Sequence, residues 1–248
     1  PQTARRMERL IIALFAVALI FFAFDKFVLA PKREATLVAA TERKAKAVAA
    51  AENKSAVSAK TIAVLPFVDM SKAKDQEYFS DGLAETTLDM LSRVPDLKVI
   101  SRTSSFAFKG KPMDVREIGK KLGVAHILEG SVQQAGDTLR ITAQLVRTSD
   151  GAHLWSKQYD RKMADIFKIQ DEVATEVVNA IQGALPAADQ QRMIGQNTGN
   201  VAAYQEYLKG IALLPGRKVN DMRTAVGHFE RAIELDPGYG RAYAMAAI

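Results

Sequence analysis

The sequence predicts an α/β protein with an N-terminal transmembrane helix and helical stalk, a mixed-sheet α/β sandwich domain, and then all-α repeat helices. Three observations support this fold class. An apolar run fills residues 10–30, strand-like and helix-like segments alternate over residues 61–185, and small and aromatic residues recur at helical spacing in residues 200–248. The length of 248 residues allows one or two folded domains besides the apolar run.

The apolar run at residues 10–30 is long enough for a membrane-spanning helix, which needs about 20 predominantly apolar residues. Its charged pair, Asp25 and Lys26, lies within about two turns of the run's end, where such side chains can reach the headgroups. A cleaved signal peptide is the main alternative, but Pro31 would directly follow the cut and disfavour processing. A buried helix of a soluble domain would leave too few polar positions for water. We therefore expect residues 1–9 to be a cytoplasmic flank and residues 10–30 a transmembrane helix.

The net charge of +6 comes entirely from the region around the apolar run. Residues 1–60 hold 11 basic and five acidic side chains, whereas the remainder holds 23 of each. Basic segments beside a membrane span are attracted to anionic lipid by about 1 kcal/mol per Lys or Arg near the surface. The charge pattern therefore predicts the lipid bilayer as a partner and no nucleic acid for this segment.

The segment at residues 31–60 is rich in Ala, Lys and Glu, a composition that favours helix. We expect a semi-rigid stalk there, with a disordered linker as the alternative because isolated helices are marginal in water. Near-continuous helical propensity from the apolar run into the stalk also suggests a homodimer whose geometry could change on binding.

Between residues 61 and 185 the apolar pattern predicts alternating strands and helices. Gly123 stands where a helix end is expected, and Gly136 with Asp137 indicates a hairpin. The last helix has apolar residues at a spacing near 3.6. The expected order is a strand at 61–67, a helix at 75–97, a strand at 97–108, a helix at 115–124, strands at 125–136, 137–151 and 151–163, and a helix at 164–185.

This region resembles the TolB amino-terminal-like domain of bacterial transmembrane regulators, from IAVLPFVDMSKAKDQEYFSDGLAE through LKVISRTSSFAFKG and AHILEGSVQQAG to GAHLWSKQYDRKMADIFKIQDEV. The likeness covers residues 61–185. It implies a binding role without catalytic residues. It also implies an upstream cytoplasmic output domain, such as a class III adenylate cyclase or a winged helix, joined through one span to a periplasmic domain.

The tail at residues 200–248 has the spacing of a tetratricopeptide repeat. The positions of a second repeat helix are occupied by Ala225, Phe229, Ala232 and Pro237. A linker at residues 186–199 is expected before the whole repeat region. Stacked repeats of this kind form a concave groove, so we expect a protein partner bound through the repeats.

The chain contains no cysteine, which excludes disulfides, thiol catalysis and thiolate metal sites. His126, His153 and His228 lack metal-ligand spacing and are interpreted as structural. Asp81 and Glu85 lie one turn apart on a predicted helix, where they could act as paired carboxylates or simply form a solvated face. The solvated face is the preferred interpretation.

Three further groups have plain structural interpretations. Gly110 and Lys111 lack the other residues of a phosphate-binding loop and predict a turn. The hydroxyls of the SRTSSF stretch have no recognisable base, so they predict a strand edge. The hydroxyl-bearing residues of the SRTSSF stretch are Ser101, Thr103, Ser104 and Ser105. Trp155 and Tyr159 could form an aromatic ligand patch, but a core or cross-strand pair is preferred. No catalytic residue, no cofactor site and no metal site is predicted.

The function predicted from the sequence is a membrane-anchored sensory or scaffold segment, not itself an enzyme, that regulates an output domain upstream of residue 1. The alternatives are the regulatory part of a class III adenylate or guanylate cyclase, or of a winged-helix transcription regulator. The expected location is the bacterial inner membrane, single-pass, with the α/β and repeat domains in the periplasm. Lys and Arg flank both ends of the run, so charge alone does not fix this orientation.

Overall fold

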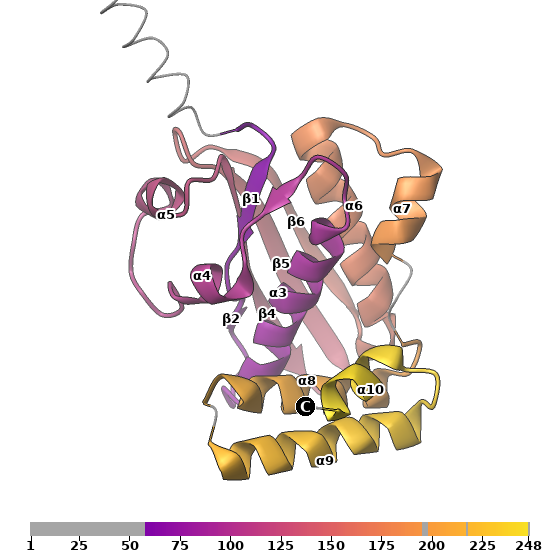
Figure 1. Cartoon of the computed structure of the whole chain (residues 1–248). Helices are drawn as coiled ribbons and strands as arrows, with labels where there is room; N and C mark the ends of the chain where they lie inside the picture. Colours follow the sequence, from indigo (N-terminus) through magenta and orange to yellow (C-terminus); the bar gives the residue numbers. More distant parts are fainter. Residues whose placement is uncertain (1–57, 195–197, 217, 248) are drawn as a thin grey trace, which may run out of the picture. The chain divides into compact units, whose positions relative to one another are not determined.

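The computed structural model describes residues 58–194, 198–216 and 218–247 (Figure 1). The predicted cytoplasmic flank at residues 1–9, the predicted transmembrane helix at residues 10–30 and the stalk up to residue 57 lie outside the described residues.

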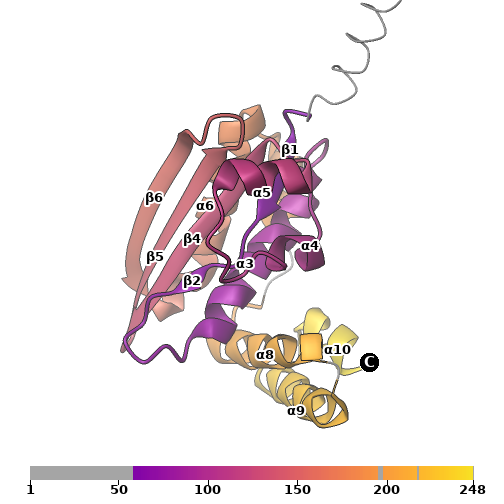
Figure 2. The same ribbon diagram turned by 90° about the vertical axis from the view of Figure 1, so that its left-hand side faces the viewer.

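The described chain is built on one mixed sheet. Its strands run in the order β3-β1-β4-β5-β6, and β2 pairs with β4 away from this path. The pairs β1–β3, β1–β4 and β2–β4 are parallel, whereas β4, β5 and β6 are antiparallel and lie side by side in Figure 2. The bounds are β1 (Thr61–Val64), β2 (Val68–Asp69), β3 (Lys98–Val99), β4 (His126–Ala135), β5 (Thr138–Arg147) and β6 (His153–Lys162).

Helices α3 (Glu77–Ser92) and α6 (Ile166–Gln182) form the main core with one face of the sheet. Side chains alternate along a strand, so Ile62 of β1 joins this core while Ala63 joins a second, smaller cluster on the other face. Both faces of β1 are therefore buried, which explains why the residues that follow Thr61 in this short strand are all apolar.

The second face is covered at one end by α5 (Val115–Leu122), which buries Ile118 against the sheet. The helix begins at Asp114, whose side chain accepts the backbone N–H of Arg116. It ends at Gly123, in the left-handed conformation with φ 66° that a glycine allows. Beyond the reach of α5, β4 and β5 carry polar side chains on this face, and the cavity described below lies there.

The remaining helices are α4 (Arg102–Phe106), α7 (Ala187–Ile194), α8 (Val201–Leu213), α9 (Val219–Leu235) and α10 (Gly240–Ala246), with 3₁₀ turns at Met163–Asp165 and Leu214–Gly216. Helices α8, α9 and α10 lie together at one end of the sheet (Figures 1 and 2). They belong to the same compact unit as the sheet, Val57–Ile248.

Helix α8 approaches α3 closely because Gly82 has no side chain. A Cβ at this position would lie 2.4 Å from a terminal carbon of Leu208. Beside this contact the hydroxyl of Tyr204 lies 3.0 Å from the Thr86 hydroxyl and accepts a hydrogen bond of 2.6 Å from Gln170. Tyr204 is fully buried. Small-residue packing and a buried polar network thus join α8 to both α3 and α6.

The predicted fold class is wrong as stated. Over residues 58–194, 198–216 and 218–247 the structure is a mixed α/β sheet domain followed by helices, and none of these helices is long and apolar enough to cross a membrane. In α6, for example, the buried apolar residues recur at helical spacing along one side, which packs in the core. Tetratricopeptide repeats at residues 200–248 are not shown.

The predicted strand at residues 97–108 is also wrong over most of its length. The strand ends at Val99, and Arg102–Phe106 is the helix α4. After Ile100 donates its N–H to the Ile62 carbonyl, the chain leaves the sheet. The hydroxyl-rich stretch has a helical backbone that buries Ser105, so the burial available in the folded unit outweighs a weak local preference for strand.

Candidate functional site

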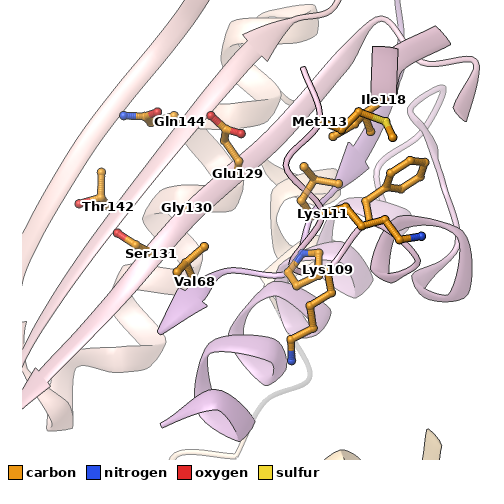
Figure 3. Close-up of a pocket in the computed structure, with 13 residues that line it drawn as sticks. Val68, Lys109, Lys111, Met113, Ile118, Glu129, Gly130, Ser131, Thr142 and Gln144 are labelled. Carbon is orange, nitrogen blue, oxygen red and sulfur yellow. The ribbon is translucent and has the colours of Figure 1, made fainter. Parts of the chain in front are cut away.

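The candidate site is a cavity of about 410 Å³ between the polar part of the sheet and the loop that joins α4 to α5 (Figure 3). This volume lies within the range of about 300–1,000 Å³ typical of ligand pockets. Its lining residues are Leu65, Pro66, Val68, Phe108, Lys109, Lys111, Met113, Ile118, Glu129, Gly130, Ser131, Thr142 and Gln144. We call this cavity the sheet groove.

The strand wall of the sheet groove holds four polar side chains in two cross-strand pairs. Glu129 of β4 faces Gln144 of β5, and Ser131 faces Thr142. Residues two apart on a strand share a face, so all four lie on the same side of the sheet (Figure 3). All four are half-buried, and their side chains make no hydrogen bond or ion pair with the described part of the chain. Their hydrogen-bonding capacity is available to a ligand.

The opposite wall combines apolar side chains with two lysines that are already engaged. The Lys109 ammonium lies 2.5 Å from carboxylate oxygens of both Glu77 and Asp81 on α3. The Lys111 ammonium lies 5.9 Å from the centre of the Phe108 ring, and Figure 3 shows it directed away from the strand wall. The charge that remains without an ionic partner on the strand wall is therefore the negative charge of Glu129.

A second cavity of about 230 Å³ adjoins the sheet groove and shares Pro66, Val68 and Lys109 with it. Val68, which lines both cavities, is 56% exposed, and Met70, two residues further along the chain, is 54% exposed. The two cavities and the exposed side chains together form a continuous surface along β2.

The predicted carboxylate pair is used for structure. Asp81 binds Lys109, and Glu85 receives a hydrogen bond of 2.7 Å from Arg102 of α4. Burial raises the pKa of both Asp81 and Glu85, although the basic partners oppose this shift. These ion pairs join α3 to α4 and the following loop. Both carboxylates are therefore half-buried and structural, whereas the solvated face predicted from the sequence would leave them in water.

The three histidines lie apart from one another, and the described ranges contain no cluster of residues able to hold a metal ion. His126 is buried with its Nδ1 atom 3.3 Å from the Thr61 carbonyl oxygen, and burial lowers its pKa. His228 lies 2.7 Å from Glu206 in the helical part. His153 is exposed at the start of β6.

The remaining candidates also have structural contacts. The Trp155 indole N–H donates to Glu176 of α6 at 2.7 Å, and Tyr159 is 2% exposed, so both belong to the core side of β6. The hydroxyls of Ser101 and Ser104 lie 3.2 Å apart at the start of α4. Gly110 has φ 67° in the turn that precedes α5, and its neighbour Lys111 lines the sheet groove. The groove itself was not predicted, although alternation of polar residues along β4 and β5 is visible in the sequence.

Parts of the chain are similar to a family of regulator domains and to a protein described as a putative adenylate cyclase. Residues 58–176 match the family model of the HilA/YgeH-like transcriptional regulator, second domain. A protein of Rhizobium meliloti (strain 1021) described as "Putative adenylate cyclase 3" is 41% identical over 189 residues, which cover 76% of this chain and 32% of the relative. The chain thus spans about a third of the length of this relative.

Among solved structures, TolB from Acinetobacter baumannii is 17% identical with a TM-score of 0.38, over 50% of this chain and 28% of that chain. Lipoprotein GNA1162 from Neisseria meningitidis is 21% identical with a TM-score of 0.36, over 42% of this chain and 80% of that chain.

The comparisons support the predicted resemblance in part. A relative described as a putative adenylate cyclase matches this chain, whereas tetratricopeptide repeats are not shown. The family model that residues 58–176 match describes a regulator domain, which fits the prediction that this chain is not itself an enzyme.

Proposed function

We propose that this chain is the regulatory part of an adenylate-cyclase-type protein, and that its α/β unit binds a partner protein which changes the cyclase output. The 41% identity to the Rhizobium meliloti relative supports the cyclase assignment. The chain aligns with about a third of that relative, which leaves room for a separate catalytic domain.

The observation that carries a binding role is the sheet groove. Its strand wall presents a carboxylate, an amide and two hydroxyls that the described part of the chain does not use, opposite an apolar wall. Convergent polar groups in a partly apolar cavity are typical of binding sites. A binding site without catalytic groups suits a domain that senses a partner and leaves the reaction to another domain.

The test is cyclic AMP production by the full-length gene product in a bacterial strain that lacks its own adenylate cyclase. We expect cyclic AMP to accumulate, and removal of residues 58–248 to change its level without removing the activity. A catalytically inactive variant of the upstream domain is the control for background. A protein that produces no cyclic AMP with or without residues 58–248 would contradict the cyclase assignment.

A transcription regulator is the second candidate, because the match at residues 58–176 is to a HilA/YgeH-like regulator domain. This function predicts a DNA-binding domain of about 100 residues with a basic recognition helix upstream. Electrophoretic mobility shift of DNA from the protein's own promoter region, measured with the full-length protein, distinguishes it from a cyclase.

The periplasmic location and the protein partner of the helices remain proposals. Reporters active only in the periplasm or only in the cytoplasm, fused after Leu185 in the full-length protein, test the location. The predicted homodimer is tested by crosslinking of single cysteines placed along residues 39–51 of the full-length protein, where the absence of any crosslinked dimer would contradict it.

A further inference from the structure

We propose that the sheet groove receives an extended segment of the partner protein, which places a Lys or Arg beside Glu129 and apolar side chains along Val68 and Met70. This inference rests on the proposed function in one respect, that the α/β unit binds a protein. It adds the site and the chemistry that the partner must supply.

Charge complementarity selects a basic side chain. Glu129 is half-buried on the strand wall and forms no ion pair with the described residues. The lysines of the opposite wall do not neutralise it, because Lys109 is bound by Glu77 and Asp81 and Lys111 lies over the Phe108 ring. A half-buried carboxylate without a cation gains most from an incoming ammonium or guanidinium group.

The other groups of the groove suit the rest of such a side chain and its backbone. The aliphatic stem of Lys or Arg can lie on the Met113 and Ile118 side chains, which form the opposite wall. Gln144 supplies both an amide acceptor and a donor beside Glu129, and the Ser131 and Thr142 hydroxyls lie one pair further along the same face. These groups can pair with the peptide groups of an extended chain.

The apolar surface along β2 favours a polypeptide over a small amine. The second cavity shares Pro66 and Val68 with the sheet groove, and both Val68 and Met70, two residues further along the chain, are more than half exposed. A small amine would fill the sheet groove alone and leave these side chains in water. An extended segment with alternating basic and apolar residues covers the groove and the exposed pair together.

The experiment measures binding of capped tetrapeptides to the 248-residue chain by NMR, with labelled methyl groups on Met and Ile. The probe is acetyl-Val-Lys-Val-Leu-amide, and the matched peptide has norleucine in place of lysine, which keeps the stem and removes the charge. We expect the signals of Met113 and Ile118 to move. The lysine peptide should bind at least about tenfold more tightly than the norleucine peptide, because one hydrogen bond to a charged group changes an affinity by about this factor.

Two variants locate the charge. Glu129→Gln should reduce the affinity for the lysine peptide to that for the norleucine peptide, because the amide keeps the shape and loses the charge. Glu230→Gln, an exposed position on α9, is the matched control and should leave both affinities unchanged.

Equal affinity for the two peptides, an unchanged preference in Glu129→Gln, or no movement of the Met113 and Ile118 signals would overturn the inference. Butylamine that binds as tightly as the lysine peptide would overturn it as well, since the site would then be one for small amines. The NMR experiment measures peptide binding and does not depend on cyclase activity. If the chain prefers the lysine peptide but the full-length protein makes no cyclic AMP, the proposed cyclase function is refuted and this inference stands.

Discussion

At the scale of single residues, Asp171 of α6 stands out among the carboxylates of the described chain. Burial raises its pKa from 3.8 to about 6, and it forms no ion pair with the described residues. A carboxyl whose pKa is higher in the folded state binds its proton more tightly when folded. The contribution of Asp171 to the free energy of unfolding is therefore fully present below about pH 3.8. This contribution is lost as pH rises through about 6.

Asp171→Asn should stabilise the protein at pH 7.5 and have little effect near pH 3, below the unfolded value of 3.8, because the amide resembles the protonated carboxyl. The midpoint of thermal unfolding, measured at both pH values by circular dichroism, checks this. Asp137→Asn in the exposed turn between β4 and β5 is the control and should show no such difference. A variant that shifts the midpoint equally at both pH values would mean that burial of the charge is not the cause.

At the scale of elements, the packing of α8 on α3 depends on the Gly82–Leu208 contact. A Cβ at position 82 would lie 2.4 Å from Leu208, whose side chain is 1% exposed and has little room to move. Overpacking of this kind costs about 1–3 kcal/mol, and the better helix propensity of Ala returns at most about 1 kcal/mol.

Gly82→Ala should therefore lower the free energy of unfolding. As a single variant, Leu208→Ala should lower it by a larger amount, because it leaves a cavity. In the double variant the two changes should partly compensate, because the added methyl group enters the space that the leucine leaves. Urea titrations of the wild type, both single variants and the double variant measure this coupling. Strict additivity would show that the two residues do not contact each other in solution.

The elements best predicted from the sequence are those whose signal is local. Helix α6 follows from the spacing of its apolar residues, and the β4–β5 hairpin from Gly136 and Asp137. The two-residue turn even determines that Glu129 faces Gln144, since the pairing is counted back from Ala135 and Thr138. Helix α4 and β2 were missed because tertiary burial decides them. The groove was missed with them, because its opposite wall is the loop that follows α4.

At the scale of the whole molecule, polar and charged contacts unite the helical end with the sheet. Arg241 of α10 and Arg93 of α3 both bind Asp89, and the Tyr204 hydroxyl lies between Thr86 of α3 and Gln170 of α6. Burial raises the pKa of Tyr204 well above its usual value, so the hydroxyl stays protonated in this network. A disturbance in α8 should reach the strands through α6.

Tyr204→Phe tests whether the sheet and the helices unfold as one. The substitution keeps the ring and removes a hydroxyl that two buried polar side chains share, which should cost about 1–3 kcal/mol. Trp155, the single tryptophan of the chain, lies on β6 and reports the state of the sheet through its fluorescence, while circular dichroism reports the helices. If the unit is cooperative, both signals should shift to the same lower urea concentration in Tyr204→Phe and stay unchanged in Tyr243→Phe, where the tyrosine is 50% exposed. Loss of the helical signal at a lower urea concentration than the Trp155 signal would instead mean that the helical end unfolds by itself, and a partner bound there could not be sensed at the sheet.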